Sequence, residues 1–340
     1  MTPSAPPEYN VTNQDYTRRD HFRSDVSAII DIHAHVTRTR PTGDGAEPTL
    51  DQADTMMAVA SEFGIHRIVT MCAADDIAPL RERFGNRLIF NGSIAKKNAD
   101  APDDDAYRVL DQFLTSGVRL LKFWSAPRGR ERGLVVDAPW RIEAARRARA
   151  AGVRIVMVHI ADPDRWFSTV YADSAKFGTK PEQYAGLCRM LEAFPDLTWI
   201  AAHMGGDPEH PDHLQELIEH YPNLRFDTSA AKWQIREVSA HRDAVRALIC
   251  RYPERFLFGS DLVTRHGLAR EHYVSRYWCH RTLWESELQV RSPIADGDYV
   301  PGADGSATPL LQGLDLPGDV LDKVYRENAA KLLDSRDADS

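Results

Sequence analysis

The chain has 340 residues, of which 43% are hydrophobic and 27% are charged. This is the composition of a folded globular protein, and no apolar run approaches the ~20 residues that a membrane-spanning helix needs. With 42 Lys and Arg against 50 Asp and Glu, the net charge is -8, so we expect neither a membrane nor a nucleic-acid partner.

Four cysteines, Cys72, Cys188, Cys250 and Cys279, lie far apart and form no Cys-x-x-Cys pair. This spacing indicates neither a disulfide framework nor a cysteine zinc site. The first residues, MTPSAPPEYN, lack the basic and apolar regions of a secretory signal. We therefore expect a cytoplasmic protein in a reducing compartment.

The first 27 residues are polar and begin with a Pro-rich stretch, which predicts an N-terminal arm over 1–27. From residue 28, short runs of Ile, Val, Leu and Phe alternate with segments of helical period, the pattern of repeated βα units. Gly before several runs, as at Gly117 and Gly152, is expected to end the preceding helix. The expected strands are Ala28–His33, Arg67–Cys72, Leu88–Ile94, Val118–Phe123, Val153–His159, Leu197–His203, Leu224–Ser229 and Phe256–Asp261.

Eight such units over roughly 240 residues favour an α/β fold of the (β/α)8 TIM-barrel type, as a single domain over 28–335. The alternative is an open doubly wound sheet, but no Gly-x-Gly-x-x-Gly follows the first run to indicate a dinucleotide site. After Asp261 the repeat breaks. Residues 262–309 form an expected insertion, either a lid over the site or an excursion packed outside the barrel, before a last helix at Pro317–Leu333.

The strongest local signal is the pair His33 and His35 at the end of the first expected strand. Residues i and i+2 of a strand share a face, so both imidazoles can reach one ion. His159, His203 and Asp261 end the fifth, sixth and eighth strands, at the face where barrels build their active sites. Together they suit Zn²⁺, Mn²⁺ or Fe²⁺. Taken singly, His159 is also explained as a core histidine and Asp261 as a helix N-cap.

With these residues in place, the chain resembles the amidohydrolase superfamily. The similar branch is amidohydrolase-2, which includes aminocarboxymuconate-semialdehyde decarboxylase, resorcylate-type decarboxylases and hydrolases. The resemblance runs from about Ala28 to Leu333. It rests on the motifs DIHAH, VHIAD, AAHMGGD, FGSDL and ENAAKLL, with Lys122 on the fourth strand.

The resemblance implies a metal-dependent enzyme with one divalent ion, for which we expect Zn²⁺. The implied ligands are His33, His35, His159 and Asp261. His203 is implied beside the water, and Asp261 is implied to take its proton. Asp31, the first residue of the DIHAH motif, is expected to be structural.

Lys122 leaves a second arrangement open. In related branches a lysine on strand four is carboxylated and bridges two metals, so a binuclear site is the alternative to one ion. A salt bridge at the barrel rim, or contact with the substrate, would also explain this lysine.

Substrate contacts are expected from Arg38, Trp124 and Trp233, in the loops after the first, fourth and seventh strands. Cations among aromatic rings suit a planar anion such as an aromatic or unsaturated carboxylate. The same loops also carry Arg40, Arg128, Trp166, Lys232, Arg265 and His266.

Three functions are weighed on these grounds. The first is hydrolysis of an amide, ester or lactone of a small, anionic molecule. The second is a lyase reaction at the same centre, namely non-oxidative decarboxylation or hydration of a carboxylate. The third, a non-catalytic binding module, is disfavoured because the full ligand set is present. The expected partner is a small-molecule substrate, with a homodimer as the candidate assembly.

Overall fold

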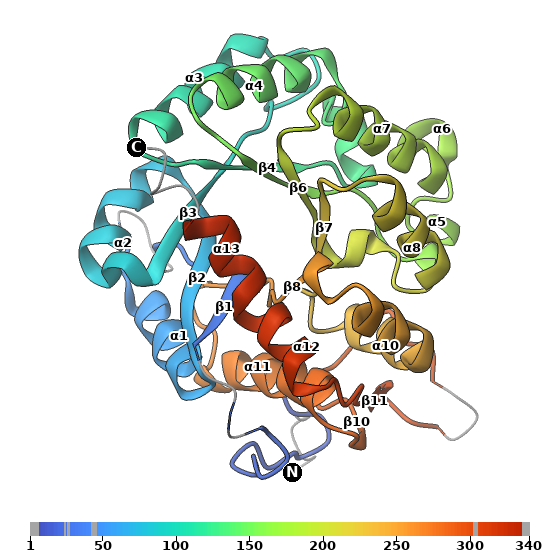
Figure 1. Ribbon diagram of the computed structural model, residues 1–340. Helices are drawn as coiled ribbons and strands as arrows, with labels where there is room; N and C mark the ends of the chain where they lie inside the picture. The colour runs from blue at the N-terminus through green and yellow to red at the C-terminus, as the bar shows by residue number, and fades with distance from the viewer. Residues whose placement is uncertain (1–6, 24, 26–27, 42–45, 302–304, 335–340) are drawn as a thin grey trace.

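The structure is a computed structural model that describes residues 7–23, 25, 28–41, 46–301 and 305–334. Parallel strands form its centre and helices surround them (Figure 1). The strands are β1 (Ile29–His35), β2 (Ile65–Cys72), β3 (Leu88–Ser93), β4 (Leu120–Trp124), β5 (Ile155–His159), β6 (Thr198–Ala201), β7 (Leu224–Asp227), β8 (Phe256–Leu257) and β9 (Leu262–Val263).

The helices that follow the strands are α1 (Asp51–Glu62), α2 (Ile77–Phe84), α3 (Asp103–Thr115), α4 (Pro139–Ala150), α5 (Asp164–Ser168), α6 (Ser174–Phe177), α7 (Lys180–Ala193), α8 (Pro211–His220), α9 (Trp233–Ala240), α10 (Arg242–Arg251), α11 (Arg270–Glu285), α12 (Gly318–Asp322) and α13 (Asn328–Asp334). At the ends of α3 and α4, Gly117 and Gly152 have φ of +81° and +91°. Glycine adopts this left-handed conformation at no steric cost, which explains the expected helix ends.

The eighth strand closes the barrel. Its first half, β8, pairs with β7, and its second half, β9, pairs with β1 at the other edge of the sheet. Between the halves, the backbone N–H of Ile32 donates to the Phe258 carbonyl and that of Asp261 donates to the His33 carbonyl. The fold class predicted from sequence, a (β/α)8 barrel, is confirmed.

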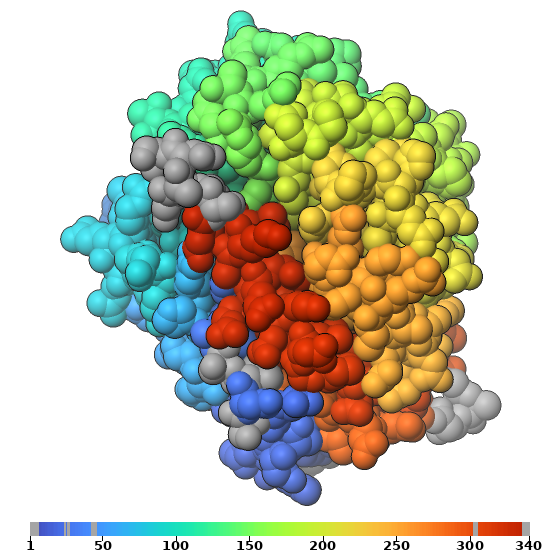
Figure 2. All heavy atoms as spheres, viewed as in Figure 1, coloured from blue at the N-terminus to red at the C-terminus, as the bar shows by residue number. Residues whose placement is uncertain are grey.

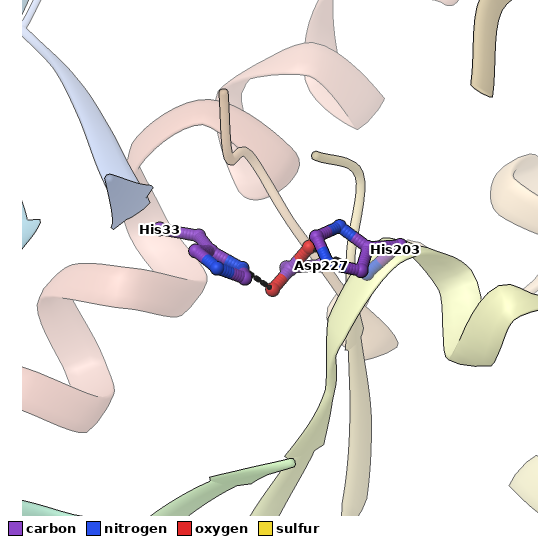
Figure 3. Close-up of side chains that lie close together, drawn as sticks. All are labelled: His33, His203 and Asp227. Atoms are coloured by element: carbon purple, nitrogen blue, oxygen red, sulfur yellow. Dashed lines mark hydrogen bonds and ion pairs between the residues drawn. The ribbon is translucent and has the colours of Figure 1, made fainter. Parts of the chain in front are cut away.

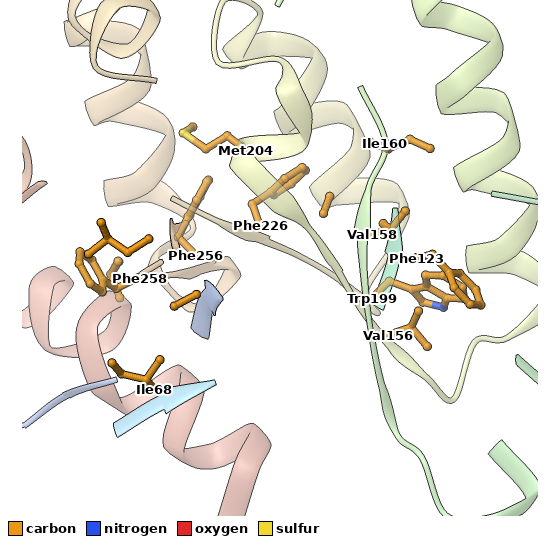
Figure 4. Packing of buried hydrophobic residues seen from close by; sticks show 14 of the residues in the cluster. Ile68, Phe123, Val156, Val158, Ile160, Trp199, Met204, Phe226, Phe256 and Phe258 are labelled. Atoms are coloured by element: carbon orange, nitrogen blue, oxygen red, sulfur yellow. The ribbon is translucent and has the colours of Figure 1, made fainter. Parts of the chain in front are cut away.

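Two sets of apolar side chains stabilise the barrel. One fills its interior and includes Ile30, Ile32, Val69, Met71, Leu120, Ile155, Met157, Ile200 and Leu257. The other packs the outer faces of the strands against the helices and includes Phe123, Trp199, Phe226 and Phe256 (Figure 4). Burial of such large apolar side chains contributes ~1.5–3 kcal/mol each.

The last helical segment covers the amino-terminal end of the barrel. It runs through α12, a π-helical turn at Lys323–Glu327 and α13, close to the expected Pro317–Leu333. Ala329 and Leu333 of α13 pack into the interior cluster. In Figure 2 this segment, in red, occupies the centre of the visible face. The functional site must therefore lie at the opposite, carboxyl end of the strands.

A bulge in β1 orients the first two histidines. The pairing of β1 with β2 shifts register between Asp31 and Ala34. Strict alternation would place Asp31 and His33 on one face, but the shift separates them. The buried Asp31 carboxylate instead accepts hydrogen bonds from the Ser260 N–H (3.0 Å), the Ser260 hydroxyl (2.5 Å) and the Tyr277 hydroxyl (3.2 Å). Asp31 thus joins β1 to the eighth strand and to α11, which fits its expected structural role.

Several strands end earlier than expected. The strand expected at Leu197–His203 stops at Ala201, because His203 and Met204 have positive φ values of 58° and 52°. The seventh strand stops at Asp227 rather than Ser229, and the eighth is interrupted after Leu257. The first strand instead continues to His35. Each early end turns the chain sharply at the carboxyl edge of the sheet.

The segment expected as an insertion divides into parts with different surroundings. Helix α11 packs against α1 and α9, and its Tyr273, Tyr277, Trp278 and Trp284 are buried. The hairpin of β10 (Gln289–Arg291) and β11 (Leu310–Gln312) follows and packs on α9. Between the two hairpin strands, Asp298 accepts a hydrogen bond of 3.1 Å from the indole N–H of Trp166. In the described part of the chain, no helix has the length and apolarity to cross a membrane.

Candidate active site

A cavity of about 470 Å³ lies at the carboxyl ends of the strands. The structure brings together there eight of the nine site residues expected from sequence. The lining residues are His33, His35, Ser93, Lys122, Trp124, Ala126, Arg128, His159, Asp162, Trp166, Tyr171, His203, Trp233, Asp261 and Val263. Arg38 is the expected site residue that does not line this cavity.

Three of the expected metal ligands meet at one point. The Oδ1 atom of Asp261 lies 3.4 Å from Nε2 of His33 and 3.2 Å from Nε2 of His35. Donors bound at ~2.1 Å to a tetrahedral ion are separated by ~3.4 Å, so these separations fit a shared divalent cation. Burial raises the pKa of Asp261, but the hydrogen bond from His35 and the nearby imidazoles lower it by a larger amount, so the pKa lies well below its usual range. The carboxylate is therefore ionised, as a metal ligand must be.

The backbone holds Asp261 in a strained conformation. Its φ is +57°, and its N–H donates to the His33 carbonyl at 2.7 Å. Left-handed backbone is costly for a residue other than glycine and occurs often at functional sites. Here it turns the carboxylate toward the two histidines on the first strand.

Asp227 orients His33 and was not expected from the sequence. Its Oδ2 accepts a hydrogen bond of 2.8 Å from Nδ1 of His33, and its Oδ1 accepts one of 2.8 Å from the backbone N–H of His203 (Figure 3). With the proton fixed on Nδ1, the Nε2 atom of His33 presents its lone pair toward Asp261. Such a carboxylate behind a histidine ligand fixes the tautomer and increases its basicity.

Ser229 fixes the tautomer of His203 in the same way. The Ser229 hydroxyl donates to Oδ1 of Asp227, so its oxygen accepts the hydrogen bond of 2.7 Å from Nδ1 of His203. Burial lowers the pKa of His203 to about 3. His203 is therefore a neutral imidazole at pH 7, with an unprotonated Nε2.

His159 has a different partner from the other expected ligands. Its Nε2 lies 3.0 Å from Oδ1 of Asp162, and the other oxygen of Asp162 accepts a hydrogen bond of 2.8 Å from the Tyr171 hydroxyl. Among the described residues, the groups whose donor atoms converge closely enough for one ion include His33, His35 and Asp261 but not His159. Its ring nevertheless lies beside that of His203, with centroids 4.8 Å apart.

Lys122 lies on the cavity wall without a hydrogen-bond partner for its Nζ among the described residues. Burial lowers its pKa to about 8, although Asp227 and Asp261 favour the charged form. An unpaired buried amine costs free energy, which makes Lys122 a candidate to contact a bound group.

The expected substrate contacts are only partly brought together. Trp124 and Trp233 line the cavity, with their rings edge-on to His159 and His203, respectively. Arg38 instead donates from Nε to Oδ1 of Asp76 at 2.7 Å. The cavity cation from these loops is Arg128, in the 3-10 helix Pro127–Arg132 after β4.

Asp227, Ser229, Asp162 and Tyr171 are the site residues that sequence reasoning missed. A signal was present for Asp227, because it ends the seventh strand just as His159 ends the fifth. Asp162 lies in the VHIAD motif. Tyr171 carried no such signal, because it joins the site only through the fold of the loop after β5.

Imidazole and carboxylate donors at the carboxyl ends of barrel strands are typical of enzymes of this fold that bind a metal, so this site is a candidate metal centre. A family model described as Amidohydrolase matches residues 30–334, so the chain belongs to the amidohydrolase family. This family typically uses a divalent metal, and the His and Asp groups above are the candidates to bind it.

The solved structures that share the fold include two that cover most of this chain. One is 4-oxalomesaconate hydratase, LigJ, from Rhodopseudomonas palustris, with 13% identity and a TM-score of 0.53 over 92% of this chain and 97% of that chain. The other is ATU3138 from Agrobacterium tumefaciens, with 13% identity and a TM-score of 0.50 over 91% and 96%. No curated protein matches the chain. At these identities the likeness shows the fold alone.

Proposed function

We propose that the protein is a metal-dependent hydrolase that cleaves an amide, ester or lactone of a small carboxylate. The observation that carries this proposal is the convergence of His33, His35 and Asp261, with donor atoms 3.2–3.4 Å apart, on the wall of the cavity. The proposed ligands are these three residues and His159, whose ring would turn from Asp162 to join them.

The donor set fits a divalent ion, for which Zn²⁺ is the first candidate. Neutral imidazoles and one ionised carboxylate are the ligands that Zn²⁺, Mn²⁺ and Fe²⁺ accept. When bound, such an ion lowers the pKa of water and polarises a carbonyl. One ion is favoured, and a second held through Lys122 is the alternative.

In this proposal Asp261 transfers the proton of the water and His203 orients the water. The Asp261 carboxylate accepts the proton of the attacking water at Oδ2 and returns it to the leaving group. His203 has its proton on Nδ1, where Ser229 holds it, so its Nε2 accepts a hydrogen bond and orients the water. Because Nε2 carries no proton, it cannot donate a hydrogen bond to a developing oxyanion, so orientation of the water is the favoured role of His203.

Trp124 and Trp233 support a planar substrate, because their rings flank the cavity next to His159 and His203. Arg128 supplies a positive charge on the same wall. These groups suit an aromatic or unsaturated acid derivative.

The test is a substrate panel of amides, esters and lactones of such acids, assayed on metal-loaded protein for acid products and for CO₂. Asp261→Asn should lose turnover at least ~100-fold, since general base catalysis contributes ~10²–10⁴-fold. The matched control is Asp164→Asn, because Asp164 lies after β5 but pairs with Lys180 outside the cavity. Release of CO₂ without hydrolysis would replace the hydrolase by the decarboxylase alternative, and full activity of Asp261→Asn would contradict the mechanism.

A further inference from the structure

A second cavity, of about 300 Å³, adjoins the first. The two share Trp233, Asp261 and Val263 in their walls. A molecule that extends from one to the other would therefore pass directly beside Asp261. The second cavity is lined by Ala230, Ala231, Lys232, Trp233, Ser260, Asp261, Leu262, Val263, His272 and Arg276.

Three basic side chains of this cavity surround one carboxylate from the other end of the chain. Arg276 Nη2 lies 3.0 Å from both oxygens of Glu8, and His272 Nδ1 lies 2.8 Å from Oε1. Lys232 Nζ lies 3.4 Å from Oε2. Burial raises the pKa of Glu8, but these three partners lower it by a larger amount, so the pKa lies well below its usual range. The basic side chains of the cavity wall thus already bind a carboxylate supplied by the protein itself.

We propose that Arg276, His272 and Lys232 form a carboxylate subsite for the substrate, and that Glu8 occupies it until a substrate carboxylate displaces it. This inference rests on the proposed function, because it places a substrate acid group next to Asp261. The subsite assigns the anion contact to α11 and to the residue before α9. Arg38, which is bound to Asp76, has no part in it.

The basic side of the contact is built into the barrel. The Arg276 side chain is only 7% exposed, and its Nη1 donates to the His272 carbonyl and the Ser275 hydroxyl. These bonds lie within α11, so they remain when Glu8 leaves. A buried guanidinium without an anion is costly, so an incoming carboxylate gains a preformed, charge-assisted contact.

The Glu8 side chain can leave its three partners without disrupting the main chain next to it. The Glu8 side chain is 44% exposed. The adjoining main chain is held separately, by the Ala295 N–H to the Glu8 carbonyl and by the Val11 N–H to the Pro293 carbonyl, each 2.8 Å long. Rotation about the side-chain bonds of Glu8 would free the three basic side chains while these backbone bonds stay in place.

The experiment measures binding of glutarate, a dicarboxylate, and of its neutral diamide by isothermal titration calorimetry to metal-loaded protein. In Glu8→Gln the competing charge is gone, so glutarate should bind about tenfold more tightly than to the unaltered protein, while the diamide is unaffected. Glu8→Ala provides an independent variant with the same expected result. The matched control, Glu47→Gln, changes an exposed glutamate elsewhere and should leave both affinities unchanged.

Glutarate also binds metals, so Glu8→Gln with Arg276→Gln separates the two sites: the tenfold gain should vanish. An unchanged glutarate affinity in both Glu8 variants, or a gain that persists without Arg276, would overturn the subsite. Binding requires no turnover. A glutarate gain in a protein that hydrolyses nothing would therefore support the subsite and refute the proposed function, and hydrolysis without any gain would do the reverse.

Discussion

Replacing Asp227 by Asn tests how the site controls its first ligand. The carboxylate has two different sets of donors: Oδ1 accepts from the backbone N–H groups of His203 and Ser229, and Oδ2 accepts from Nδ1 of His33. Asn can keep its carbonyl oxygen toward the two N–H groups. Its NH₂ group then faces Nδ1 of His33, where two donors would meet.

His33 can resolve this conflict only by moving its proton from Nδ1 to Nε2. Protonated Nε2 has no lone pair for a metal, so the ligand toward Asp261 is lost in the favoured tautomer. Loss of a carboxylate behind a metal-binding histidine typically costs 10–100-fold in metal affinity, which is about 1.4–2.7 kcal/mol. We expect Asp227→Asn to fall in this range.

The assay is a chelator competition that gives the metal Kd of each variant. Asp207→Asn is the matched control, because Asp207 is equally buried and its Oδ2 lies 2.7 Å from Nδ1 of His213, outside the candidate site. Both variants should lose stability, by ~1.5–3 kcal/mol for a hydrogen bond to a charged group. Unchanged metal affinity in Asp227→Asn, or an equal loss in Asp207→Asn, would refute the reasoning.

Three further outcomes are expected. His203→Ala should keep its metal while turnover falls ~10²-fold or more, as measured by metal analysis and steady-state kinetics; parallel loss of both would indicate the binuclear arrangement with Lys122. In metal-free protein, the folded-state pKa of Lys122 is about 8 against a usual 10.5, so between these pH values the unfolded state binds more protons than the folded state. The contribution of Lys122 to the free energy of unfolding therefore rises with pH across this range, by up to about 3 kcal/mol. Chemical denaturation at pH 7.5 and 10 should show this rise in the unaltered protein but not in Lys122→Met, and an identical rise in both would contradict the burial of the amine. Arg128→Ala should raise the KM of an anionic substrate by only about 2- to 5-fold, because the Arg128 side chain is exposed. Arg38→Ala should leave KM unchanged, because Arg38 pairs with Asp76 outside the cavity, and a large effect on KM would contradict that pairing.

The barrel itself could be predicted from the sequence, because each buried strand is a short apolar run and several of the preceding helices end at a recognisable turn. The strand ends could not. The left-handed conformations of His203 and Asp261 have no signature in residue type, since positive φ in a residue other than glycine is set by the surrounding backbone. The β1 bulge is equally hidden, and it places Asp31 and His33 on different faces.

The candidate site was predictable where position along a strand determines it, as for His33, His35 and Asp261. Partners across the barrel were not predictable, because they depend on register between elements far apart in the chain. For this reason the contact of His33 with Asp227, 194 positions away, and that of Arg38 with Asp76, 38 positions away, could not be predicted. The contact of Glu8 with α11 likewise joins residues 268 positions apart, and no local pattern announces it.

The metal content of the purified protein tests the central claim most directly. We expect about one divalent ion per chain in the unaltered protein, measured by inductively coupled plasma mass spectrometry. In the double variant His33→Ala, His35→Ala, two of the three converging donors are gone, so the ion should be absent while the barrel remains folded by circular dichroism. Full metal occupancy in that folded double variant would contradict the assignment of the metal centre.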